Sequence, residues 1–319
     1  MRALVFDRFG PPEVLHVREV PDPQPTSGQV LVRTKAIGLN FADVYRRKGT
    51  YHLAGSPPFI AGYEAAGVVV SASAGSGFIE GQPVGFADMP FANAELVAVD
   101  AARLIPLPAD ISLDTAAAVL LQGLTAQYLV RDSHAVKSGD RVLVHAAAGG
   151  VGLLLTQWCA SLGAKVIGLT STDDKARAVM EAGAQAVLLY GDDWVEQVQS
   201  LSDGGVDVAY DSVGSTLMLS FAATRKRGHV VFYGMAGGDP PHIDPRMLMD
   251  TSKHLSGGDL WNVLTSAQER QTRAEDLFAR VRSGALKVHI DSRFALADGA
   301  LAHQRLESRA SSGKVLLIP

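Results

Sequence analysis

The chain has 319 residues, of which 47% are hydrophobic and 19% charged, and this length and composition suit a globular protein with two domains. The formal net charge of −4 gives no general attraction to nucleic acid or to an anionic membrane, so we expect neither as a partner. The N-terminal residues lack the apolar core of a signal peptide, and no apolar run approaches the roughly 20 residues that cross a bilayer. Because Cys159 is the only cysteine, there is no intrachain disulfide, and we expect a cytoplasmic protein.

The first hundred residues predict short strands separated by turns. Four segments are rich in Val, Leu and Ile, and stretches rich in Pro and Gly divide them. We expect an antiparallel, barrel-like domain built from the segments 2–7, 29–40, 65–72 and 93–100.

From Ser112 onward the pattern changes to helices and strands in alternation. Ser112 is placed to cap a helix that reaches Ser133, and Asp114 lies in its first turn, where the helix dipole favours an acid. The alternation that follows is typical of right-handed crossovers and a parallel, doubly wound sheet. Its predicted strands are Val142–Ala146, Lys165–Thr170, Ala186–Tyr190, Val206–Asp211 and His229–Tyr233, and the tail then predicts helices at 273–284 and 297–308 and strands at 286–294 and 314–319.

A glycine turn follows the first of these parallel strands. Ala147, Gly149 and Gly152 occupy the three positions of the G-x-G-x-x-G pattern, which gives a tight turn, a close approach of backbone to a pyrophosphate, and close helix packing. The N–H groups that open the next helix attract phosphate charge. Small residues also occur wherever a helix packs tightly on a sheet, but the position of this turn between strand and helix favours a dinucleotide site.

The end of the second parallel strand indicates which dinucleotide is bound. NAD-binding proteins place an acid there for the ribose hydroxyls, whereas this strand ends at Thr170 and Ser171 without one. Lys175 in the following helix, like Arg177, could meet a 2′-phosphate. Asp173 and Asp174 could be displaced ribose ligands, but acids are also favoured in the first turn of a helix. We therefore favour NADP(H) over NAD(H).

Several motifs in the same order resemble the zinc-independent NADPH:quinone oxidoreductases, the zeta-crystallin-like branch of the medium-chain dehydrogenase/reductase superfamily. They are "KAIGLNFADVYRRKGTY", "PPFIAGYEAAGVV", "LLQGLTAQYLV", "HAAAGGVGLLLTQWCASLGAKVIG", "AYDSVGS" and "LESRASSGKVLLIP". The resemblance covers nearly the whole chain. It implies an α/β protein with a GroES-like, β-rich catalytic domain at 1–122 and 263–319 and a doubly wound Rossmann domain at 123–262. It also implies a homodimer that pairs through the sheet of the Rossmann domain, in the region His254–Leu260.

The chain departs from its zinc-dependent relatives at the catalytic metal ligands. Their Cys, His and Cys correspond to Asn40, Tyr63 and a position near Leu121, which cannot form the nitrogen and sulfur site that zinc prefers. We expect no catalytic metal. Without one, an isolated ketone is hard to reduce, whereas a quinone or an α,β-unsaturated carbonyl spreads the incoming charge over its own π-system.

Six residues are candidates for contact with the substrate or the reacting groups. Asn40 offers an amide to a carbonyl oxygen or to the nicotinamide amide, and Tyr45 and Tyr51 offer ring faces and hydroxyls to a planar substrate. Tyr51 is equally well explained as a loop aromatic, and Asp43 as an acid at a helix start. The remaining candidates are Gln122 and Thr125, and Thr125 could instead simply pack between helices.

The resemblance also implies twelve residues around the cofactor NADPH. Those of the glycine turn contact the pyrophosphate and the nicotinamide ribose, a second group surrounds the 2′-phosphate, and a third follows the fourth and fifth parallel strands. Phe232 is alternatively explained as a core strand residue whose backbone alone contacts the cofactor. The three groups are Ala147, Gly149, Gly150, Val151 and Gly152; Ser171, Lys175 and Tyr190; and Ser212, Val213, Phe232 and Gly234.

Three functions remain open at this point. The first is an NADPH-dependent quinone oxidoreductase, and the second is an NADPH-dependent reductase of 2-alkenals or enones, which would differ only in its substrate site. The third, of another class, is a crystallin-like or RNA-binding protein that binds NADPH without turnover. The acidic balance and the lack of a basic run with interleaved aromatic residues argue against RNA.

Overall fold

Two units make up the computed structural model, which describes residues 1–191 and 193–319. Unit 1 comprises Met1–Leu124, Leu264–Ser283 and Val288–Pro319, and unit 2 comprises Thr125–Val263 and Gly284–Lys287. The resemblance implies domain boundaries after residue 122 and before residue 263, and it does not imply that Gly284–Lys287 belong with unit 2. The chain passes from unit 1 to unit 2 within the helix α2 (Leu113–Tyr128).

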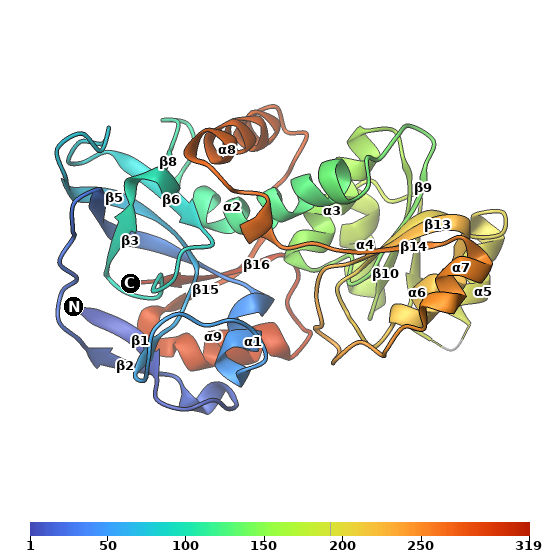
Figure 1. Ribbon diagram of the computed structural model, residues 1–319, viewed down its shortest axis with the longest axis horizontal. Coiled ribbons are helices and arrows are strands. Elements are labelled where there is room, and N and C mark those ends of the chain that lie inside the picture. Colours follow the sequence, from blue (N-terminus) through green and yellow to red (C-terminus); the bar gives the residue numbers. More distant parts are fainter. Residues whose placement is uncertain (192) are drawn as a thin grey trace. The chain divides into compact units, whose positions relative to one another are not determined.

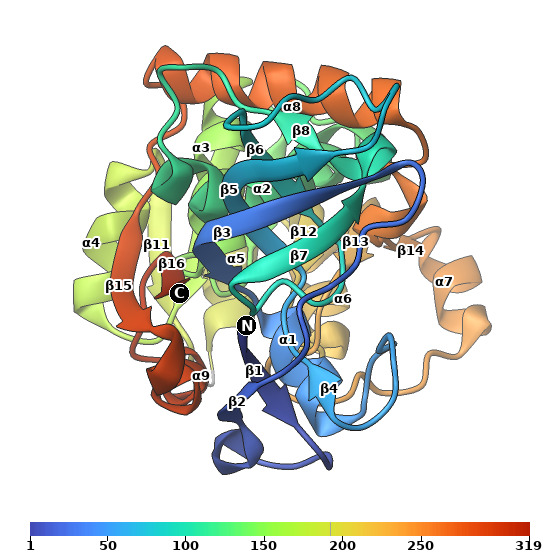
Figure 2. The ribbon, with the colours of Figure 1, turned by 90° about the vertical axis from the view of Figure 1, so that its left-hand side faces the viewer.

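The strands of unit 1 form two sheets among the described residues. The larger has the order β15-β16-β3-β5-β6-β8, with β7 paired to β3, and the smaller has the order β2-β1-β4 (Figure 2). The strand pairs of these sheets are antiparallel, as predicted for the first hundred residues, and β16 of the tail joins β3 in the same way, whereas β15 pairs with β16 in parallel. The strands are β1 (Arg2–Phe6), β2 (His16–Glu19), β3 (Gln29–Leu39), β4 (Phe59–Ile60), β5 (Glu64–Ala72), β6 (Pro83–Ala87), β7 (Leu96–Asp100), β8 (Ile105–Pro106), β15 (Ile290–Ala295) and β16 (Lys314–Ile318).

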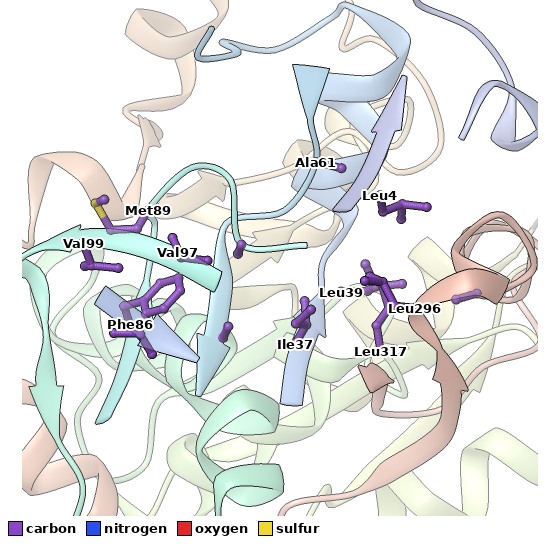
Figure 3. Packing of buried hydrophobic residues seen from close by; sticks show 14 of the residues in the cluster. Leu4, Ile37, Leu39, Ala61, Phe86, Met89, Val97, Val99, Leu296 and Leu317 are labelled. Carbon is purple, nitrogen blue, oxygen red and sulfur yellow. The ribbon is translucent and has the colours of Figure 1, made fainter. Parts of the chain in front are cut away.

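An apolar core cluster joins segments near the two ends of the chain in unit 1. Ile37 and Leu39 of β3 are fully buried in the same cluster as Leu317 of β16 and Leu296, which precedes the last helix (Figure 3). Burial of side chains of this size contributes about 1.5–3 kcal/mol each. The tail therefore returns to the front of the chain because the strands there need a hydrophobic partner.

The helices of unit 1 are α1 (Phe41–Lys48), α8 (Ala267–Arg282) and α9 (Gly299–Glu307), besides the first part of α2. Ser112 caps α2 as predicted, since its hydroxyl accepts a hydrogen bond from the Thr115 N–H. The predicted helix 273–284 begins earlier, at Ala267, because the Ser266 hydroxyl caps it. α1 and α9 lie side by side (Figure 1), and the buried Arg47 joins them through Glu307 at 2.6 Å.

Unit 2 contains one parallel sheet among its described residues, with the order β11-β10-β9-β12-β13-β14. Figure 1 labels β9, β10, β13 and β14 of this sheet. Two strands match their predictions fully, three differ at their ends, and β14 at the sheet edge was not predicted as a strand. The strands are β9 (Arg141–Val144), β10 (Lys165–Thr170), β11 (Ala186–Leu189), β12 (Val206–Asp211), β13 (Thr224–Phe232) and β14 (His254–Gly257). The helices are α3 (Gly150–Ser161), α4 (Asp173–Glu181), α5 (Trp194–Leu201), α6 (Leu217–Ala223) and α7 (Pro245–Thr251).

These features confirm a GroES-like, β-rich unit together with a Rossmann-type unit. Within residues 1–191 and 193–319, none of the helices combines the length and the apolar character needed to cross a bilayer.

Candidate functional site

The glycine turn of unit 2 joins β9 to α3. The N–H of Ala147 donates to the carbonyl of Leu169 at 2.9 Å, and that of Gly149 donates to the carbonyl of Ala146 at 2.8 Å. Gly149 is the N-cap of α3, and no side chain caps this helix. The first N–H groups of α3 have no intrahelical acceptor, so they provide a site for an anion.

Two glycines allow this turn to be tight. A Cβ on Gly152 would lie 2.4 Å from the carbonyl oxygen of Ala146 and 2.7 Å from the Cα of Ala147, so α3 could not start so close to β9. A Cβ on Gly149 would lie 3.1 Å from the Ala146 carbonyl oxygen, which is crowded but less severe. The third position of the motif therefore serves packing, while the second keeps the backbone open, as a pyrophosphate site requires.

The end of β10 leads into α4 without an acid at the strand end. The hydroxyl of Thr172 caps α4 by accepting from the N–H of Lys175 at 3.4 Å. Asp173 and Asp174 lie in the first turn, as the alternative interpretation had it, and Asp174 forms an ion pair with Arg177. Ser171 is exposed and Lys175 half-buried. Arg177, one of the two cations considered for a 2′-phosphate, therefore has an acidic neighbour in its own helix.

The residues after β12 and β13 meet through backbone hydrogen bonds. The N–H of Ala236 donates to the carbonyl of Ser212 at 3.0 Å, and that of Gly237 donates to the carbonyl of Val213 at 2.8 Å. A Cβ on Gly234 would lie 3.1 Å from the Ser212 carbonyl oxygen. The structure thus brings Ser212, Val213 and Gly234 together at the carboxyl end of the sheet, where ligands of open α/β sheets bind.

The side chains of Phe232 and Tyr190 make contacts of two other kinds. Phe232 is partly buried and packs against the apolar core of unit 2. The hydroxyl of Tyr190 accepts a hydrogen bond from the N–H of Ala146 at 2.9 Å and lies 3.2 Å from Nδ1 of His145. The phenol is therefore bonded to the glycine turn itself.

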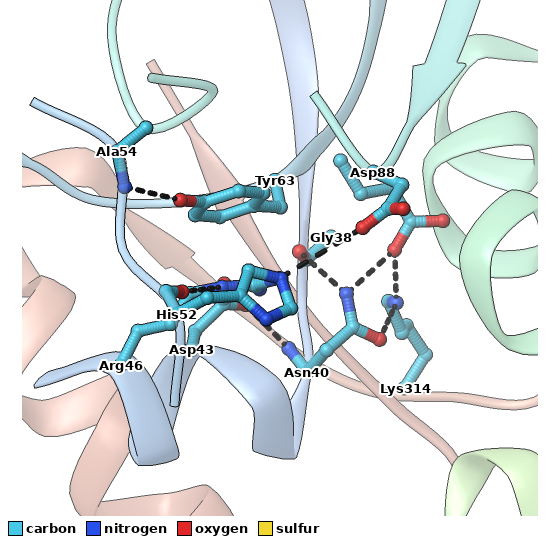
Figure 4. Close-up of polar contacts among 10 residues, drawn as sticks. Gly38, Asn40, Asp43, Arg46, His52, Ala54, Tyr63, Asp88 and Lys314 are labelled. Atoms are coloured by element: carbon cyan, nitrogen blue, oxygen red, sulfur yellow. Dashed lines mark hydrogen bonds and ion pairs between the residues drawn. The ribbon is translucent and has the colours of Figure 1, made fainter. Parts of the chain in front are cut away.

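In unit 1, Asn40 belongs to a buried polar cluster with Glu64 and Lys314 (Figure 4). Its amide nitrogen donates to Glu64 Oε2 at 2.9 Å and to the carbonyl of Gly38 at 3.3 Å. Its amide oxygen accepts from Lys314 Nζ at 2.9 Å, and Lys314 Nζ lies 2.5 Å from Glu64 Oε2. The other carboxylate oxygen of Glu64 accepts from the N–H of Leu121 at 2.7 Å.

The bonding of Asn40 limits what its side chain can still offer. Both amide hydrogens have acceptors, so the amide has no N–H left for a carbonyl oxygen. The amide oxygen keeps one lone pair and can accept a further hydrogen bond. Of the two partners predicted for Asn40, a carbonyl oxygen finds no N–H to accept from, whereas the nicotinamide amide can donate an N–H to the Asn40 oxygen.

Asp43 is buried at the start of α1, and its Oδ2 accepts from the N–H of Asn40 at 2.9 Å. This is the position of an acid that stabilises a helix start. Burial raises the pKa of Asp43 to about 6, although the Arg46 guanidinium, 3.5 Å from Oδ1, acts in the opposite direction. Asp43 is thus poised to change its charge near neutral pH.

Aromatic rings gather around the buried Arg46. Its guanidinium lies 3.3 Å from the ring centroid of Tyr63 and 5.1 Å from that of Tyr51. Tyr45 meets Tyr51 edge to face at 6.3 Å between centroids, and both rings are half-buried. The structure therefore brings Tyr45 and Tyr51 together, with partly accessible rings beside a cation.

Gln122 and Thr125, the remaining predicted residues, both lie on α2 and are largely buried. Gln122 belongs to unit 1 and Thr125 to unit 2.

The positions that hold zinc in the relatives do not fit a metal here. Asn40 already bonds a lysine ammonium, whose positive charge would repel a cation, and the hydroxyl of Tyr63 accepts from the N–H of Ala54 at 3.0 Å. Leu121 contributes only a backbone N–H at this place. Across the described parts of the chain, His, Cys, Asp and Glu form no group of three or more that could hold a metal ion.

Four residues of these sites were not predicted. Glu64 and Lys314 lie inside motifs that carried the resemblance, and a lysine that opens an apolar last strand was a usable signal. Arg46 follows Tyr45 in a helix, and nothing local marks it as buried. His145 directly precedes the glycine turn, but a lone histidine after a strand is not distinctive.

Fold and site together define a two-unit reductase of the medium-chain type with a dinucleotide turn and no zinc ligands. The family model for the alcohol dehydrogenase GroES-like domain matches residues 26–136, and the model for zinc-binding dehydrogenases matches residues 150–278. The chain belongs to the quinone oxidoreductase family of the medium-chain dehydrogenase/reductase superfamily, as its motifs predicted.

Two relatives match this chain over nearly their full lengths. A quinone oxidoreductase of Pseudomonas aeruginosa is 36% identical, covering 100% of this chain and 99% of that protein, and a 2-haloacrylate reductase of a Burkholderia species is 37% identical, covering 99% and 98%. The crystal structure of Escherichia coli quinone oxidoreductase complexed with NADPH superimposes with a TM-score of 0.96 at 36% identity, and all of both chains is covered.

Proposed function

We propose that this protein is an NADPH-dependent quinone reductase in which unit 2 holds the cofactor and unit 1 contributes the substrate-binding side chains. The observation that carries the proposal is the Asn40–Glu64–Lys314 cluster, which stands where the zinc-dependent relatives place metal ligands. With no metal to stabilise an alkoxide, the protein is suited to acceptors that delocalise charge themselves. The named quinone oxidoreductases among its relatives support this acceptor class.

For the cofactor, the residues present fit NADPH. The first N–H groups of α3 would meet the pyrophosphate, and Gly149, which has no Cβ, would let it approach the backbone. Lys175, with Ser171, would meet the 2′-phosphate, while Ser212, Val213 and Gly234 offer backbone groups at the ends of β12 and β13. NADPH, when bound, supplies the reducing electrons.

For the substrate, Tyr45 and Tyr51 provide partly accessible ring faces for a flat molecule. Arg46 places a buried positive charge beside Tyr51, which favours a ring that becomes electron-rich on reduction. Asn40 can accept one hydrogen bond, for instance from the hydroxyl of the quinol product. The task of these residues is to orient the substrate.

Steady-state assays test the proposal. Purified protein is given NADPH or NADH with 1,4-benzoquinone, a naphthoquinone or a 2-alkenal, and oxidation of the nucleotide is followed by its absorbance. We expect turnover with the quinones and a preference for NADPH. Tight NADPH binding without oxidation by any acceptor would refute the enzymatic proposal and support the crystallin-like alternative.

A second acceptor class has a specific observation in its favour. The 2-haloacrylate reductase relative is 37% identical over nearly its full length, and its name denotes a conjugated carbon–carbon double bond as the reduced group. The same assay separates the two proposals. Rapid turnover of 2-alkenals or 2-haloacrylate without any turnover of quinones would replace the first proposal by the second.

We further propose a homodimer that forms through β14. This strand ends the sheet order of unit 2, and Leu255 on it is a large apolar residue left 36% exposed. An edge strand can pair with its own copy across a twofold axis and so continue the sheet. We expect a dimer in sedimentation analysis and a monomer for Leu255→Asp, because two like charges would meet across the axis. Met180→Asp, at an exposed apolar residue of α4, is the control that should remain dimeric.

A cytoplasmic location also remains a proposal. Its support is that Cys159, the only cysteine of the sequence, is a buried free thiol, and proteins of the reducing cytoplasm rarely contain disulfides. Cell fractionation would test it.

A further inference from the structure

We propose that four side chains of unit 2, Tyr190, His145, Ser220 and Asp211, form a directed hydrogen-bond relay that positions the two backbone turns of the NADPH site. This inference rests on the proposed function, because it concerns how that cofactor site is held in shape. It assigns positioning roles to three residues that the sequence did not mark and a different role to Tyr190.

The contacts of the relay are continuous. Ser220 Oγ lies 2.6 Å from Asp211 Oδ2 and 3.0 Å from His145 Nε2. On the other side of the imidazole, Nδ1 lies 3.2 Å from the Tyr190 hydroxyl, which in turn lies 2.9 Å from the backbone nitrogen of Ala146. Asp211, Ser220 and His145 are fully buried, so water does not compete for these bonds.

The chemistry of the groups fixes the direction of each hydrogen bond. An ionised carboxylate can only accept, so the hydroxyl of Ser220 donates to Asp211. The Ser220 oxygen then accepts from Nε2–H of His145, which leaves Nδ1 as the acceptor for the Tyr190 hydroxyl. The oxygen of Tyr190 accepts from the N–H of Ala146. Every donor therefore points toward Asp211, and the neutral imidazole uses both its donor and its acceptor.

The electrostatics agree with this assignment. Burial lowers the pKa of His145 and so favours the neutral ring, although Asp211 acts in the opposite direction. Burial also opposes ionisation of Asp211, but the hydrogen bonds that its carboxylate accepts from Ser220, Val213 and Gly214 favour the charged form, and the pKa of this carboxyl lies below its usual range.

Each end of the relay holds a backbone turn in place. At one end, Ala146 has φ +47°, a left-handed conformation that a residue with a Cβ adopts only when its surroundings enforce it. At the other end, Asp211 Oδ1 accepts from the N–H groups of Val213 at 2.8 Å and Gly214 at 3.0 Å. These are the turn before α3 and the turn after β12, and both are predicted to contact the cofactor.

The relay changes the role expected of Tyr190. The resemblance places this residue around the 2′-phosphate, where its loss would weaken NADPH and spare NADH. A positioning residue acts on the turn that binds the pyrophosphate, which both nucleotides contain. Loss of the hydroxyl should therefore weaken both nucleotides by the same factor.

The test uses Tyr190→Phe and Ser220→Ala, which remove one hydroxyl each, with calorimetric titration of the full-length apoprotein by NADPH and by NADH. We expect each variant to raise the dissociation constants of both nucleotides about tenfold, with the ratio between them unchanged. The double variant should bind little worse than either single variant, because one break already interrupts the relay. Tyr210→Phe is the matched control: it removes a buried hydroxyl that bonds the Leu129 carbonyl at 3.1 Å in the same unit, and it should bind as the unmodified protein does.

Three outcomes decide between the proposals. Selective loss of NADPH in Tyr190→Phe would make Tyr190 a phosphate ligand and overturn the relay, and unchanged affinity for both nucleotides would overturn it as well. If the unmodified protein binds neither nucleotide, the proposed function fails instead, and the titration of that protein shows this separately. Should Ser220→Ala not fold, Tyr190→Phe at its half-buried position still gives the decisive ratio.

Discussion

Lys314 and Glu64 form a fully buried ion pair with 2.5 Å between Nζ and Oε2, and it joins the last strand of the chain to β5 across 250 positions of sequence. Asn40 bonds both partners, and the Leu121 N–H bonds the carboxylate. Buried charges are tolerated in a protein when they are paired and hydrogen-bonded in this way. The cluster therefore ties together the segments in which the zinc-dependent relatives keep their metal ligands.

The first prediction concerns the stability of this cluster. Lys314→Met leaves the carboxylate of Glu64 buried without its cation, and we expect the free energy of unfolding to fall by about 3–5 kcal/mol. Urea denaturation measures the change. Lys48→Met is the matched control, because Lys48 pairs with Glu307 at the surface and its loss should cost less than about 1 kcal/mol. Similar losses for the two variants would show that the buried pair has no special role.

The second prediction concerns pH. The pKa of Asp43 rises from about 4 in the unfolded chain to about 6 in the folded protein, because burial disfavours the charge. Between these values the folded state binds more protons than the unfolded state, so this group stabilises the fold fully at low pH and loses that contribution as the pH rises through 6. Asp43→Asn removes the effect while keeping an acceptor for the Asn40 N–H.

We therefore expect Asp43→Asn to gain stability relative to the unmodified protein between pH 4 and pH 7, by up to about 3 kcal/mol. Denaturation curves of both proteins at four pH values measure the difference. A difference that stays constant over this range would contradict a raised pKa.

The third prediction separates two roles within the glycine turn. Gly152→Ala places a Cβ 2.4 Å from the Ala146 carbonyl oxygen, so α3 must move, and both stability and nucleotide binding should fall. Gly149→Ala meets that oxygen only at 3.1 Å, so its stability should change by less than about 1 kcal/mol while its affinity for NADPH falls at least tenfold. Thermal unfolding and nucleotide titration give the two readouts. Equal effects of both substitutions on stability would refute this division of roles.

The fourth prediction concerns the choice of nucleotide. Lys175→Ala removes an ammonium that only a 2′-phosphate would meet, so NADPH should bind about tenfold or more weakly and NADH should be little affected. Arg177→Ala is the comparison, and it should have a smaller effect because the exposed Arg177 forms an ion pair with Asp174 of its own helix. Equal losses of NADPH and NADH in Lys175→Ala would exclude Lys175 as the selective residue.

The fifth prediction concerns metals. Because Lys314 bonds the side chain that replaces a zinc ligand, we expect prolonged dialysis against a chelator to leave the rate of quinone reduction unchanged. A zinc-dependent alcohol dehydrogenase dialysed in parallel serves as the positive control. Inhibition that added zinc reverses would require a metal site after all.

Local chemistry in the sequence determined much of this protein. The strands Lys165–Thr170 and Val206–Asp211 and the Ser112 cap are set by neighbouring residues, through apolar runs and side-chain capping, so they could be predicted closely. The glycine turn was recognisable for the same reason, since its three small residues lie within six positions. Resemblance to a known family, rather than any periodicity, indicated that the tail joins the front of the chain.

Tertiary structure alone decided which groups are used and which remain available. The amide of Asn40 was expected to bind a ligand. Its nitrogen instead donates to Gly38 and to Glu64, which is 24 positions away, and its oxygen accepts from Lys314, which is 274 positions away. The parallel pairing of β15 with β16, the edge strand β14 and the relay through His145 also depend on long-range neighbours. Burial and hydrogen bonding are properties of the folded surroundings, and a single sequence does not state which distant residues will supply them.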